Sequence, residues 1–484
     1  MVARRWPSRL RCFWQDRRGN AAMVFALVLL PLTAAAGIAV DSMLAYTVEN
    51  ELQKSLDAAG LAAGRTIDPA DVEADARSFF ASNFGAGPDL AALSNLRVDI
   101  AQADGQITLT ATARMPTTFM RLFGRDSVTV SARTVVNRQT RGMELVLVLD
   151  TTYSMMSSNK ITGLKTAATE LLDILYGDRE TVPNLWVGVV PYIAAVNVGT
   201  ANIGFLAASD RARAAPPTAF SPDTWGGCVL ARAAPRDQND DPPSIAAFRS
   251  YLYPDTPSGP SSSFINDWGS PRVPPTLRQI RYSGGVPYMT GYGPNAGCPP
   301  AITPLVAEKS RIIAAIQGLL PEARGGTLTS EGVAWGWRVI SPRWRGLWAG
   351  SPFNLPLAYG TPNMDKVMVV LTDGDNQMLV SSYNGNLVSP YTAYESHVTL
   401  NSYTTSATQA ELDRRTRNVC SNVKAQGIVL YTITFGSAPS ATGQVLMRDC
   451  ATDAAHYFHS PDNATLRTVF KSIGSQLSNL RLAR

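Results

Sequence analysis

The longest uncharged stretch of the chain lies near its N-terminus. Residues 19–40 form a run of 22 uncharged, mostly apolar residues, which follows an Arg pair and ends before Asp41. A run of this length can cross a bilayer as a helix, and the proline inside it is tolerated there. Because positively charged flanks stay in the cytoplasm, we expect residues 1–18 to be a cytoplasmic Arg-rich segment and residues 19–41 a transmembrane helix.

Two kinds of processing are alternatives to an uncleaved anchor. A secretory signal would need an exit site, and the candidate at residues 34–36 comes before the apolar run ends. Prepilin-type cleavage would use Gly19 and a Glu at the fifth position after it, where this chain has Val24. Both departures favour a segment that stays attached.

The next part of the chain alternates between helical and extended patterns. Residues 42–66 carry apolar positions three to four residues apart, which predicts that the helix continues beyond the membrane. An Asp-Gly pair at residues 104–105 between two period-two segments indicates a hairpin. A second helix and three strands are expected at residues 68–83, 96–102, 106–115 and 128–136. Residues 42–138 thus predict a small α+β module on a stalk.

From residue 140 onward, short apolar runs alternate with amphipathic segments. The runs at residues 144–149 and 366–371 are typical of buried parallel strands. Other strands are expected at residues 185–192, 428–435 and 456–459, and helices at 160–176, 305–320, 330–340, 408–426 and 464–480. This alternation predicts an α/β domain with a doubly wound, mostly parallel sheet over residues 140–484. Polar, Pro- and Gly-rich segments predict long insertions at about 199–300, 341–363 and 378–404.

Composition and charge exclude one class of partner. Apolar residues make up 45% of the chain and charged residues 17%, so a sizeable core can be buried. The net charge of +5 is already reached within the first 18 residues, which hold six Arg and one Asp. The remainder is therefore close to neutral and offers no basic face, so we expect no nucleic-acid partner.

Five cysteines indicate the redox environment. Cys228 and Cys298 share one loop-rich region, Cys420 and Cys450 lie near the C-terminus, and Cys12 stands alone. No C-x-x-C pair occurs, which argues against a zinc ribbon or a thioredoxin-like site. We expect two disulfides, one within each local pair, in an oxidising compartment, with Cys12 free. The shorter loop would contribute roughly 3 kcal/mol by the chain-entropy model.

Two acidic loops directly follow two of the expected strands. Asp150 begins the first loop, and Thr372-Asp373-Gly374-Asp375 forms the second. The carboxyl ends of parallel strands open onto one edge of the sheet, so both loops should meet there. A third loop, residues 325–329, adds hydroxyl groups between two expected helices. Carboxylates and hydroxyls together suit a hard divalent cation such as Mg²⁺.

These loops resemble a known family. Asp150-x-Thr152-x-Ser154 resembles the D-x-S-x-S signature of von Willebrand factor A domains, and Thr327 and the Thr-Asp-Gly sequence around Asp373 resemble that family's other two loops. The resemblance implies a metal ion-dependent adhesion site for Mg²⁺, or for Mn²⁺ or Ca²⁺, completed by an Asp or Glu carboxylate of a protein partner. The implied ligands are Asp150, Thr152, Ser154, Thr327 and Asp373. Thr152 departs from the usual Ser but keeps the hydroxyl, whereas the three insertions could cover or reshape the site.

The N-terminal part resembles a second family. The Arg-Arg-Gly-Asn sequence at residues 17–20, the apolar run and the amphipathic residues 48–64 look like TadE/TadG-type proteins of tight-adherence (Flp) pilus assembly. An anchor, a small module and an A domain in that order are most similar to TadG. This resemblance implies a non-enzymatic, single-pass protein of the bacterial inner membrane. Its bulk would be periplasmic and would bind pilus or envelope components.

Other functions remain as alternatives. The protein could be an envelope scaffold with a vestigial metal site, or a metal-dependent hydrolase that uses the same carboxylates. An isolated D-x-T-x-S motif is more often a helix cap than a metal site. No G-x-S-x-G elbow precedes His397, and no P-loop motif is present, so neither a serine hydrolase nor the pilus ATPase is indicated. We expect His456, His459 and the Trp residues between 335 and 348 to serve packing, and we expect no catalytic residue.

Overall fold

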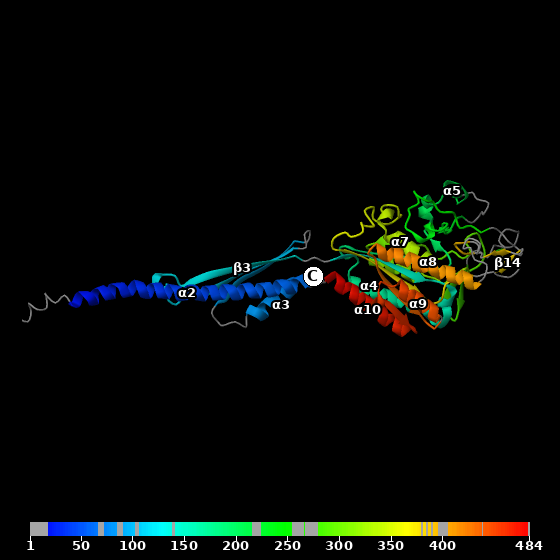
Figure 1. The fold of residues 1–484 in the computed structure, drawn as a ribbon. Coiled ribbons are helices and arrows are strands. Elements are labelled where there is room, and N and C mark those ends of the chain that lie inside the picture. Colours follow the sequence, from blue (N-terminus) through cyan, green and yellow to red (C-terminus); the bar gives the residue numbers. More distant parts are fainter. Residues whose placement is uncertain are drawn as a thin grey trace, which may run out of the picture. The chain divides into compact units, whose positions relative to one another are not determined.

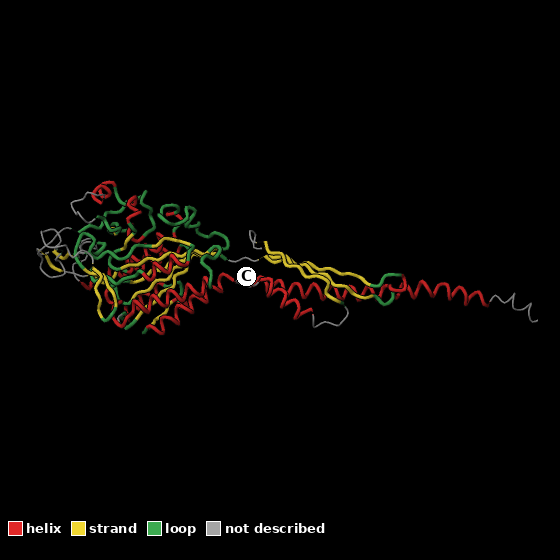
Figure 2. Tube along the Cα trace, turned by 180° about the vertical axis from the view of Figure 1, so that it is seen from behind, coloured by secondary structure: helices red, strands yellow, loops and turns green. Residues whose placement is uncertain are grey.

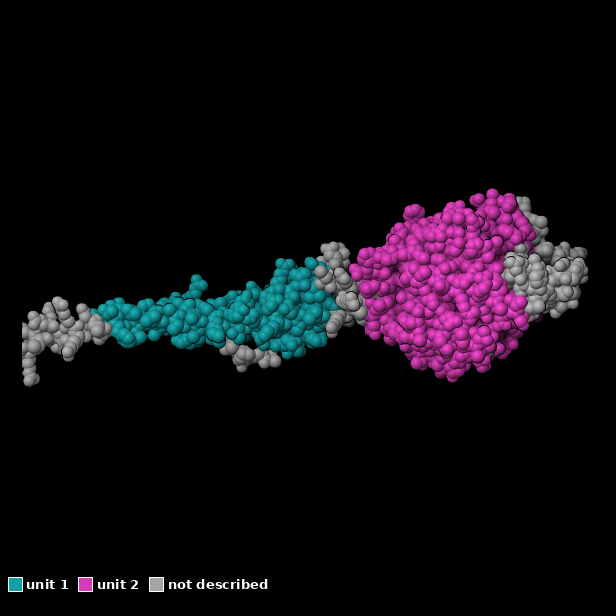
Figure 3. All heavy atoms as spheres, viewed as in Figure 1, with its two compact units in different colours: residues 1–140, 484 teal, residues 141–483 magenta. Residues whose placement is uncertain are grey.

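The structure is a computed structural model, and it separates the chain into two compact units. Unit 1 comprises residues 1–140 together with residue 484, and unit 2 comprises residues 141–483 (Figure 3). The described residues are 18–65, 72–84, 91–101, 106–137, 141–214, 224–253, 266, 279–378, 381–383, 386–388, 391–394, 405–437 and 439–482. Each unit has a hydrophobic core of its own.

Unit 1 is built on one long helix. Its elements are α2 (Arg18–Arg65), α3 (Val72–Phe84), β1 (Ala92–Ala101), β2 (Gln106–Pro116), the 3₁₀ helix η1 (Met120–Phe123) and β3 (Ser127–Asn137) (Figure 1). Helix α2 runs without interruption through Pro31, so the expected anchor and the expected amphipathic helix are one element. Helix α3 confirms the second predicted helix over Val72–Phe84, and the expected start of that helix at residue 68 lies outside the described part.

The two halves of α2 differ in what they expose. Large apolar side chains of the first half, such as Phe25, Leu27 and Leu32, are exposed. By length and composition this helix can cross a membrane. The second half instead buries Val48 and the apolar positions that follow it against the sheet of unit 1. The first half therefore lacks the protein cover that the second half has.

A three-stranded antiparallel sheet covers the second half of α2. The strands are ordered β1-β2-β3, with Ala101 opposite Gln106 in the first pair and Pro116 opposite Ser127 in the second. Alternate residues of β2, from Ile107 to Met115, point into the core. The hairpin predicted from the Asp-Gly pair is confirmed by this pairing, although residues 102–105 lie outside the described part.

Unit 2 alternates strands and helices. Its helices are α4 (Lys160–Tyr176), α5 (Ala208–Ala214), α6 (Lys309–Gln317), α7 (Thr329–Ile340), α8 (Thr405–Ala425), α9 (Ala441–Cys450) and α10 (Asn463–Leu482), and its 3₁₀ helices are η2 (Tyr153–Asn159), η3 (Thr200–Phe205), η4 (Arg236–Gln238), η5 (Pro342–Trp344) and η7 (Ala454–His456). Its strands are β4 (Gly142–Asp150), β5 (Leu185–Tyr192), β6 (Val196–Asn197), β7 (Cys228–Val229), β8 (Gln279–Ser283), β9 (Val286–Thr290), β10 (Thr303–Val306), β11 (Gly326–Thr327), β12 (Met364–Thr372), β13 (Gln377–Met378), β14 (Ser381–Tyr383), β15 (Asn386–Val388), β16 (Val429–Phe435) and β17 (Tyr457–Ser460).

The main sheet confirms the predicted fold class. Its long strands run in the order β10-β5-β4-β12-β16-β17, all parallel except β10, and β6 and β7 extend it beyond β5 (Figure 2). Numbered along the chain, this is the doubly wound order 3-2-1-4-5-6, which reverses direction between β4 and β12. Ligands bind at such a switch point, at the carboxyl ends of the strands.

Strand β4 explains why both faces of the sheet are covered. Leu145, Leu147 and Leu149 belong to a core shared with α4, α6 and α10, whereas Val146 and Val148 belong to a second core shared with α7 and α8 (Figure 1). An unbroken apolar run with alternate residues on opposite faces is what a doubly covered parallel strand requires.

Disulfides and a buried aromatic cluster link separate segments of unit 2. Both predicted disulfides, Cys228–Cys298 and Cys420–Cys450, are present, with Cα–Cα distances of 5.8 and 5.2 Å. Phe205 from the inserted segment contacts Trp344 edge to face, and Phe248 contacts it at a tilt, as part of a buried cluster with the other Trp residues. The predicted packing role of those Trp residues is thereby confirmed.

One predicted helix is partly wrong. Residues 305–320 were expected to be helical, but Leu305 and Val306 end strand β10, and α6 begins only at Lys309. A short apolar run fits a strand or a buried helix equally well by its periodicity. Here β10 pairs with one neighbour, β5, and an edge strand tolerates a proline such as Pro304.

Candidate metal site

Two buried carboxylates lie side by side at the switch point. Asp150 is the last residue of β4, and Asp373 directly follows β12. The two strands are adjacent and parallel, with Leu149 opposite Leu371. Both Asp side chains are fully buried. The sheet register therefore places two negative groups beside each other, as the acidic loops predicted.

Hydroxyl groups join these carboxylates into one cluster. The Thr152 amide and hydroxyl donate to Asp150 Oδ1 at 2.8 and 2.6 Å, and the Ser154 hydroxyl donates to Asp373 Oδ1 at 2.6 Å. The two hydroxyl oxygens lie 2.9 Å apart. Four of the five predicted ligands thus share one hydrogen-bonded cluster.

Neighbouring groups hold the cluster in position. The Thr372 hydroxyl donates to Asp150 Oδ2 at 2.9 Å, so this carboxylate is bonded at both oxygens. The Thr151 amide donates to the Tyr192 carbonyl at 2.9 Å, and the Tyr192 hydroxyl donates to the Leu371 carbonyl at 3.1 Å. These bonds tie the loop after β4 to both neighbouring strands, which orients the carboxylates.

A lysine that the sequence analysis missed completes the charge pattern. Lys160, the first residue of α4, is buried and forms an ion pair with Asp373 Oδ2. Its side chain passes close to Gly436, where an added Cβ would lie 3.2 Å from Lys160 Cδ. The sequence offered only a weak signal, namely a basic residue at the start of the helix that follows the acidic loop.

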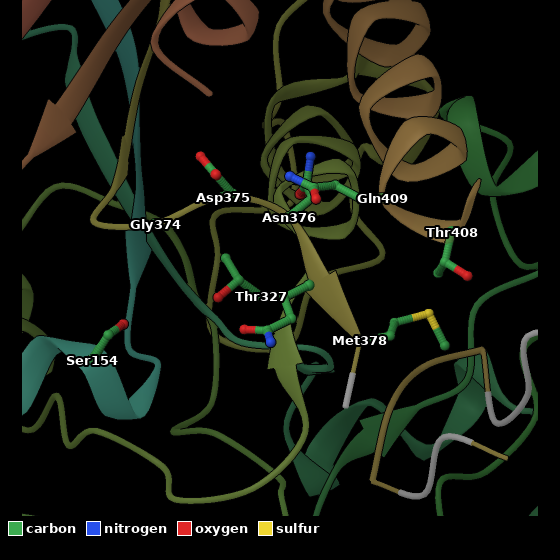
Figure 4. Close-up of a pocket in the computed structure, with 9 residues that line it drawn as sticks. Ser154, Thr327, Gly374, Asp375, Asn376, Met378, Thr408 and Gln409 are labelled. Atoms are coloured by element: carbon green, nitrogen blue, oxygen red, sulfur yellow. The ribbon is translucent and has the colours of Figure 1, made fainter. Parts of the chain in front are cut away.

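Thr327, the fifth predicted ligand, lies on a different element and beside the cluster. It lies on β11, opposite Gln377 of β13, and lines a pocket of about 380 Å³ together with Ser154 and Asp375 (Figure 4). Within the described part of the chain, no hydrogen bond joins Thr327 to the four clustered side chains. Thr327 therefore borders the pocket beside the cluster.

Asn376 connects the loop after β12 to two helices. Its side-chain oxygen accepts the Thr329 amide at 2.9 Å, and its amide nitrogen donates to Asp413 and Thr416 at 2.8 and 3.1 Å. This residue fixes the start of α7, and with it the Thr327 loop, relative to the acidic loop.

The acidic cluster carries a net negative charge when both of its carboxylates are ionised. Burial, and then the neighbouring charge of Asp373, raise the pKa of Asp150 to about 7. With both carboxylates ionised, Lys160 neutralises only one of them. A divalent cation would reverse this imbalance, because it would bring two positive charges to the remaining single negative charge.

The oxygen positions fit a small octahedral cation. Neighbouring oxygens of an octahedral Mg²⁺ shell lie about 3.0 Å apart, given metal–oxygen distances of about 2.1 Å. Thr152 Oγ1 lies 2.6, 2.9 and 3.5 Å from oxygens of Asp150, Ser154 and Asp373. Among the described residues, no group of three or more His, Cys, Asp or Glu side chains could hold a metal, so hydroxyls and water would have to complete the shell.

Unit 2 is a doubly wound α/β domain with an acidic crevice at its switch point, as the resemblance of its loops to von Willebrand factor A domains implied. Residues 19–66, which nearly coincide with α2, match the family model described as "Putative Flp pilus-assembly TadE/G-like". The resemblance stated for the N-terminal part is thereby confirmed. No curated protein matches the chain.

Three solved structures are similar to the chain at low sequence identity. The von Willebrand factor domain of the type V pili tip protein Mfa5 from Porphyromonas gingivalis is 11% identical, with a TM-score of 0.36 over 71% of this chain and 97% of that one. The pilus adhesin SpaC from Lactobacillus rhamnosus GG is 11% identical, with a TM-score of 0.35 over 79% and 33%. Proximal thread matrix protein 1 of the mussel byssus, with a zinc-occupied MIDAS motif, is 11% identical, with a TM-score of 0.31 over 70% and 46%. The chain thus spans less than half the length of the mussel protein.

Proposed function

We propose that this chain is a membrane-anchored, non-enzymatic binding protein of tight-adherence pilus assembly. Its site would take Mg²⁺, or Mn²⁺ or Ca²⁺, between Asp150, Thr152, Ser154 and Asp373, with Thr327 beside it. The observation that carries the proposal is the hydrogen-bonded cluster of two buried carboxylates and two hydroxyls at the switch point. The family match of residues 19–66 supports the pilus assignment.

The charge count supports an acidic partner. Two carboxylates and Lys160 sum to one negative charge, so a bound divalent cation leaves one net positive charge in a buried site. A carboxylate from a partner would restore neutrality and take an open position on the cation. The partner we propose is therefore a pilus or envelope protein that presents Asp or Glu.

A metal-dependent pull-down tests this binding role. The full chain, in detergent, would be incubated with solubilised envelope proteins in Mg²⁺ or in EDTA. We expect partners that are retained only with Mg²⁺ and are lost with Asp373→Ala. Retention that is unaffected by EDTA and by Asp373→Ala would favour the alternative of a scaffold with a vestigial metal site.

The hydrolase alternative lacks support from the described histidines. His456 Nδ1 pairs with Asp453 at 2.7 Å, and His459 Nδ1 bonds to the Thr434 hydroxyl at 2.9 Å. His397 lies outside the described residues. A metal-dependent hydrolase would need a group that handles protons beside the cation, and neither described histidine is bonded to the acidic cluster.

The membrane anchor is the second part of the proposal. We propose that the first half of α2 crosses the inner membrane, with residues 1–18 in the cytoplasm and unit 2 in the periplasm. The exposed apolar helix and the two disulfides support this arrangement. A reporter that is active only outside the cytoplasm should work when it is fused after Arg484. Activity of a cytoplasm-only reporter at that position would contradict the topology.

A further inference from the structure

The loop between β2 and β3 exposes large apolar side chains. Residues 117–126 contain η1, in which Leu122 and Phe123 are 80% and 62% exposed, and Phe119 before it is 39% exposed. The loop is nevertheless ordered by its own hydrogen bonds, such as those from the Gly124 amide to Arg121 and from the Leu122 amide to Phe119, both 3.1 Å. Adjacent apolar side chains held outward in this way indicate a surface with a partner.

Helix α2 fixes where this loop lies. The carboxylate of Asp41 accepts the backbone amides of Thr118, Phe119 and Met120 at 3.1, 2.8 and 2.7 Å. A Cβ added at Gly37 would lie 2.6 Å from Phe119 Cβ, so the glycine makes room for the ring. The loop therefore packs against the last turn of the apolar run in α2.

This position coincides with one boundary of the expected membrane span. At 1.5 Å per residue, 22 helical residues extend about 33 Å, close to the roughly 30 Å of a hydrocarbon core. The end of the run near residue 40, and the loop packed against it, would then lie at the outer edge of that core. Asp41 can remain charged there because three amides bind its carboxylate and bury it.

We propose that this loop inserts into the outer leaflet of the bilayer that α2 crosses. Leu122 and Phe123 enter the boundary of the acyl chains, and the exposed Arg121 and Arg125 lie at the level of the lipid phosphates. Apolar residues beside arginines are the pattern of interfacial attachment. The inference rests on the membrane anchor of the proposed function. A second attachment point would restrict rotation and tilt of unit 1 at the membrane.

A lipid bilayer fits this surface better than a second copy of the chain. The surface consists of a few side chains on one short loop, far less than the roughly 800 Å² per partner of a stable protein interface. It also adjoins an apolar helix that by length and composition can cross a bilayer. The bilayer is therefore the occupant that the surroundings of the loop favour.

Depth-dependent quenching tests the insertion. The full chain with Cys12→Ser would carry Leu122→Cys, labelled with an environment-sensitive fluorophore, in vesicles that contain chain-brominated phospholipid. The four remaining cysteines are in disulfides and do not react. The matched control is Val135→Cys, an apolar position on β3 that is 44% exposed. We expect bromine to quench the label at position 122 and to leave the label at 135 unaffected.

A third label separates this inference from the anchor on which it rests. A fluorophore at Leu27→Cys, in the apolar half of α2, reports the anchor alone. Quenching at positions 27 and 122 supports the inserted loop. Quenching at position 27 without quenching at position 122 overturns the proposal that the loop inserts into the bilayer, and leaves the anchor intact. No quenching at either position overturns the anchor as well.

Discussion

The two ends of the β4–β12 strand pair carry buried acidic residues in contrasting surroundings. At the amino end, Glu144 lies opposite Lys366 and forms a buried ion pair with it. Glu144 also accepts the Leu357 amide at 2.7 Å, and Lys366 donates to the Ile340 carbonyl at 3.0 Å. At the carboxyl end, Asp150 lies beside Asp373, Lys160 forms an ion pair with Asp373, and Ser154 of the same cluster lines a pocket.

The contrast separates a structural pair from a binding site. At the amino end the charges cancel, and backbone groups bind both side chains. Burial still raises the pKa of Glu144 and lowers that of Lys366, because removal from water disfavours both charged forms. At the carboxyl end one negative charge is left over, and its neighbours are hydroxyls that can also bind a cation. The same strand pair thus carries a neutral ion pair at its amino end, and at its carboxyl end an acidic cluster that can bind a ligand.

The largest expected effect comes from breaking the amino end. Glu144→Ala would leave Lys366 buried without its partner, which should lower the free energy of unfolding by about 3–5 kcal/mol. Urea denaturation of the full chain in detergent measures this loss. Replacing both residues, as Glu144→Leu with Lys366→Met, should restore most of the stability, because no unpaired charge remains.

The corresponding change at the carboxyl end is the comparison. In EDTA, Asp150→Ala should change the free energy of unfolding by no more than about 1 kcal/mol, because lost hydrogen bonds are offset by relief of a buried charge beside Asp373. Equal losses for Glu144→Ala and Asp150→Ala would contradict the distinction between the two ends.

Added metal should stabilise the fold through the carboxyl end only. A ligand at 100 times its dissociation constant raises the free energy of unfolding by about 2.7 kcal/mol. We expect that increase with Mg²⁺ in the wild-type chain and in the double Glu144→Leu, Lys366→Met variant. Thermal denaturation with and without Mg²⁺ measures it. An increase that persisted in Asp373→Ala would place the metal elsewhere.

Removal of the lysine should strengthen metal binding. Lys160→Met deletes a positive charge that is paired with Asp373, so the affinity for Mg²⁺ should rise at least tenfold, or about 1.4 kcal/mol. Lys165→Met on the same helix is the matched control, since Lys165 donates to the Gln317 carbonyl. Unchanged affinity in Lys160→Met would show that the lysine does not oppose the cation.

The smallest effect on metal binding is expected from a change at a hydroxyl ligand. Thr152→Ala should weaken Mg²⁺ binding by about 1 kcal/mol, because water can replace a neutral ligand more easily than a carboxylate. Thr152→Ser keeps the hydroxyl and should bind nearly as well as the wild type. Isothermal titration of the three proteins makes the comparison. A loss in Thr152→Ser as large as that in Thr152→Ala would show that the methyl group matters instead.

The sequence predicts which residues lie at the strand ends, but it does not predict which side chains from other elements contact them. Unbroken apolar runs identified β4 and β12, and parallel pairing then placed Asp150 beside Asp373. The contact of Lys160 depends on the path of η2 between the motif and α4, which includes left-handed backbone at Ser158 and Asn159. Local patterns in a sequence carry no information on such a path.

Two other failures have similar causes. The apolar pattern places β10 at the start of a helix, because four apolar-rich residues have too little periodicity to distinguish a strand from a helix. The contact between Asp41 and the loop at residue 119 joins positions 78 residues apart, which only the folded sheet of unit 1 brings together. Side chains that meet across elements therefore had to come from the structure.

Calorimetric titration of Mg²⁺ and Mn²⁺ into the full chain in detergent tests the central claim most directly. The account predicts one binding site per chain in the wild type and no binding in Asp150→Ala or Asp373→Ala, with both variants still folded. Absence of binding to the wild type at millimolar metal, or unchanged binding in Asp150→Ala, would contradict it.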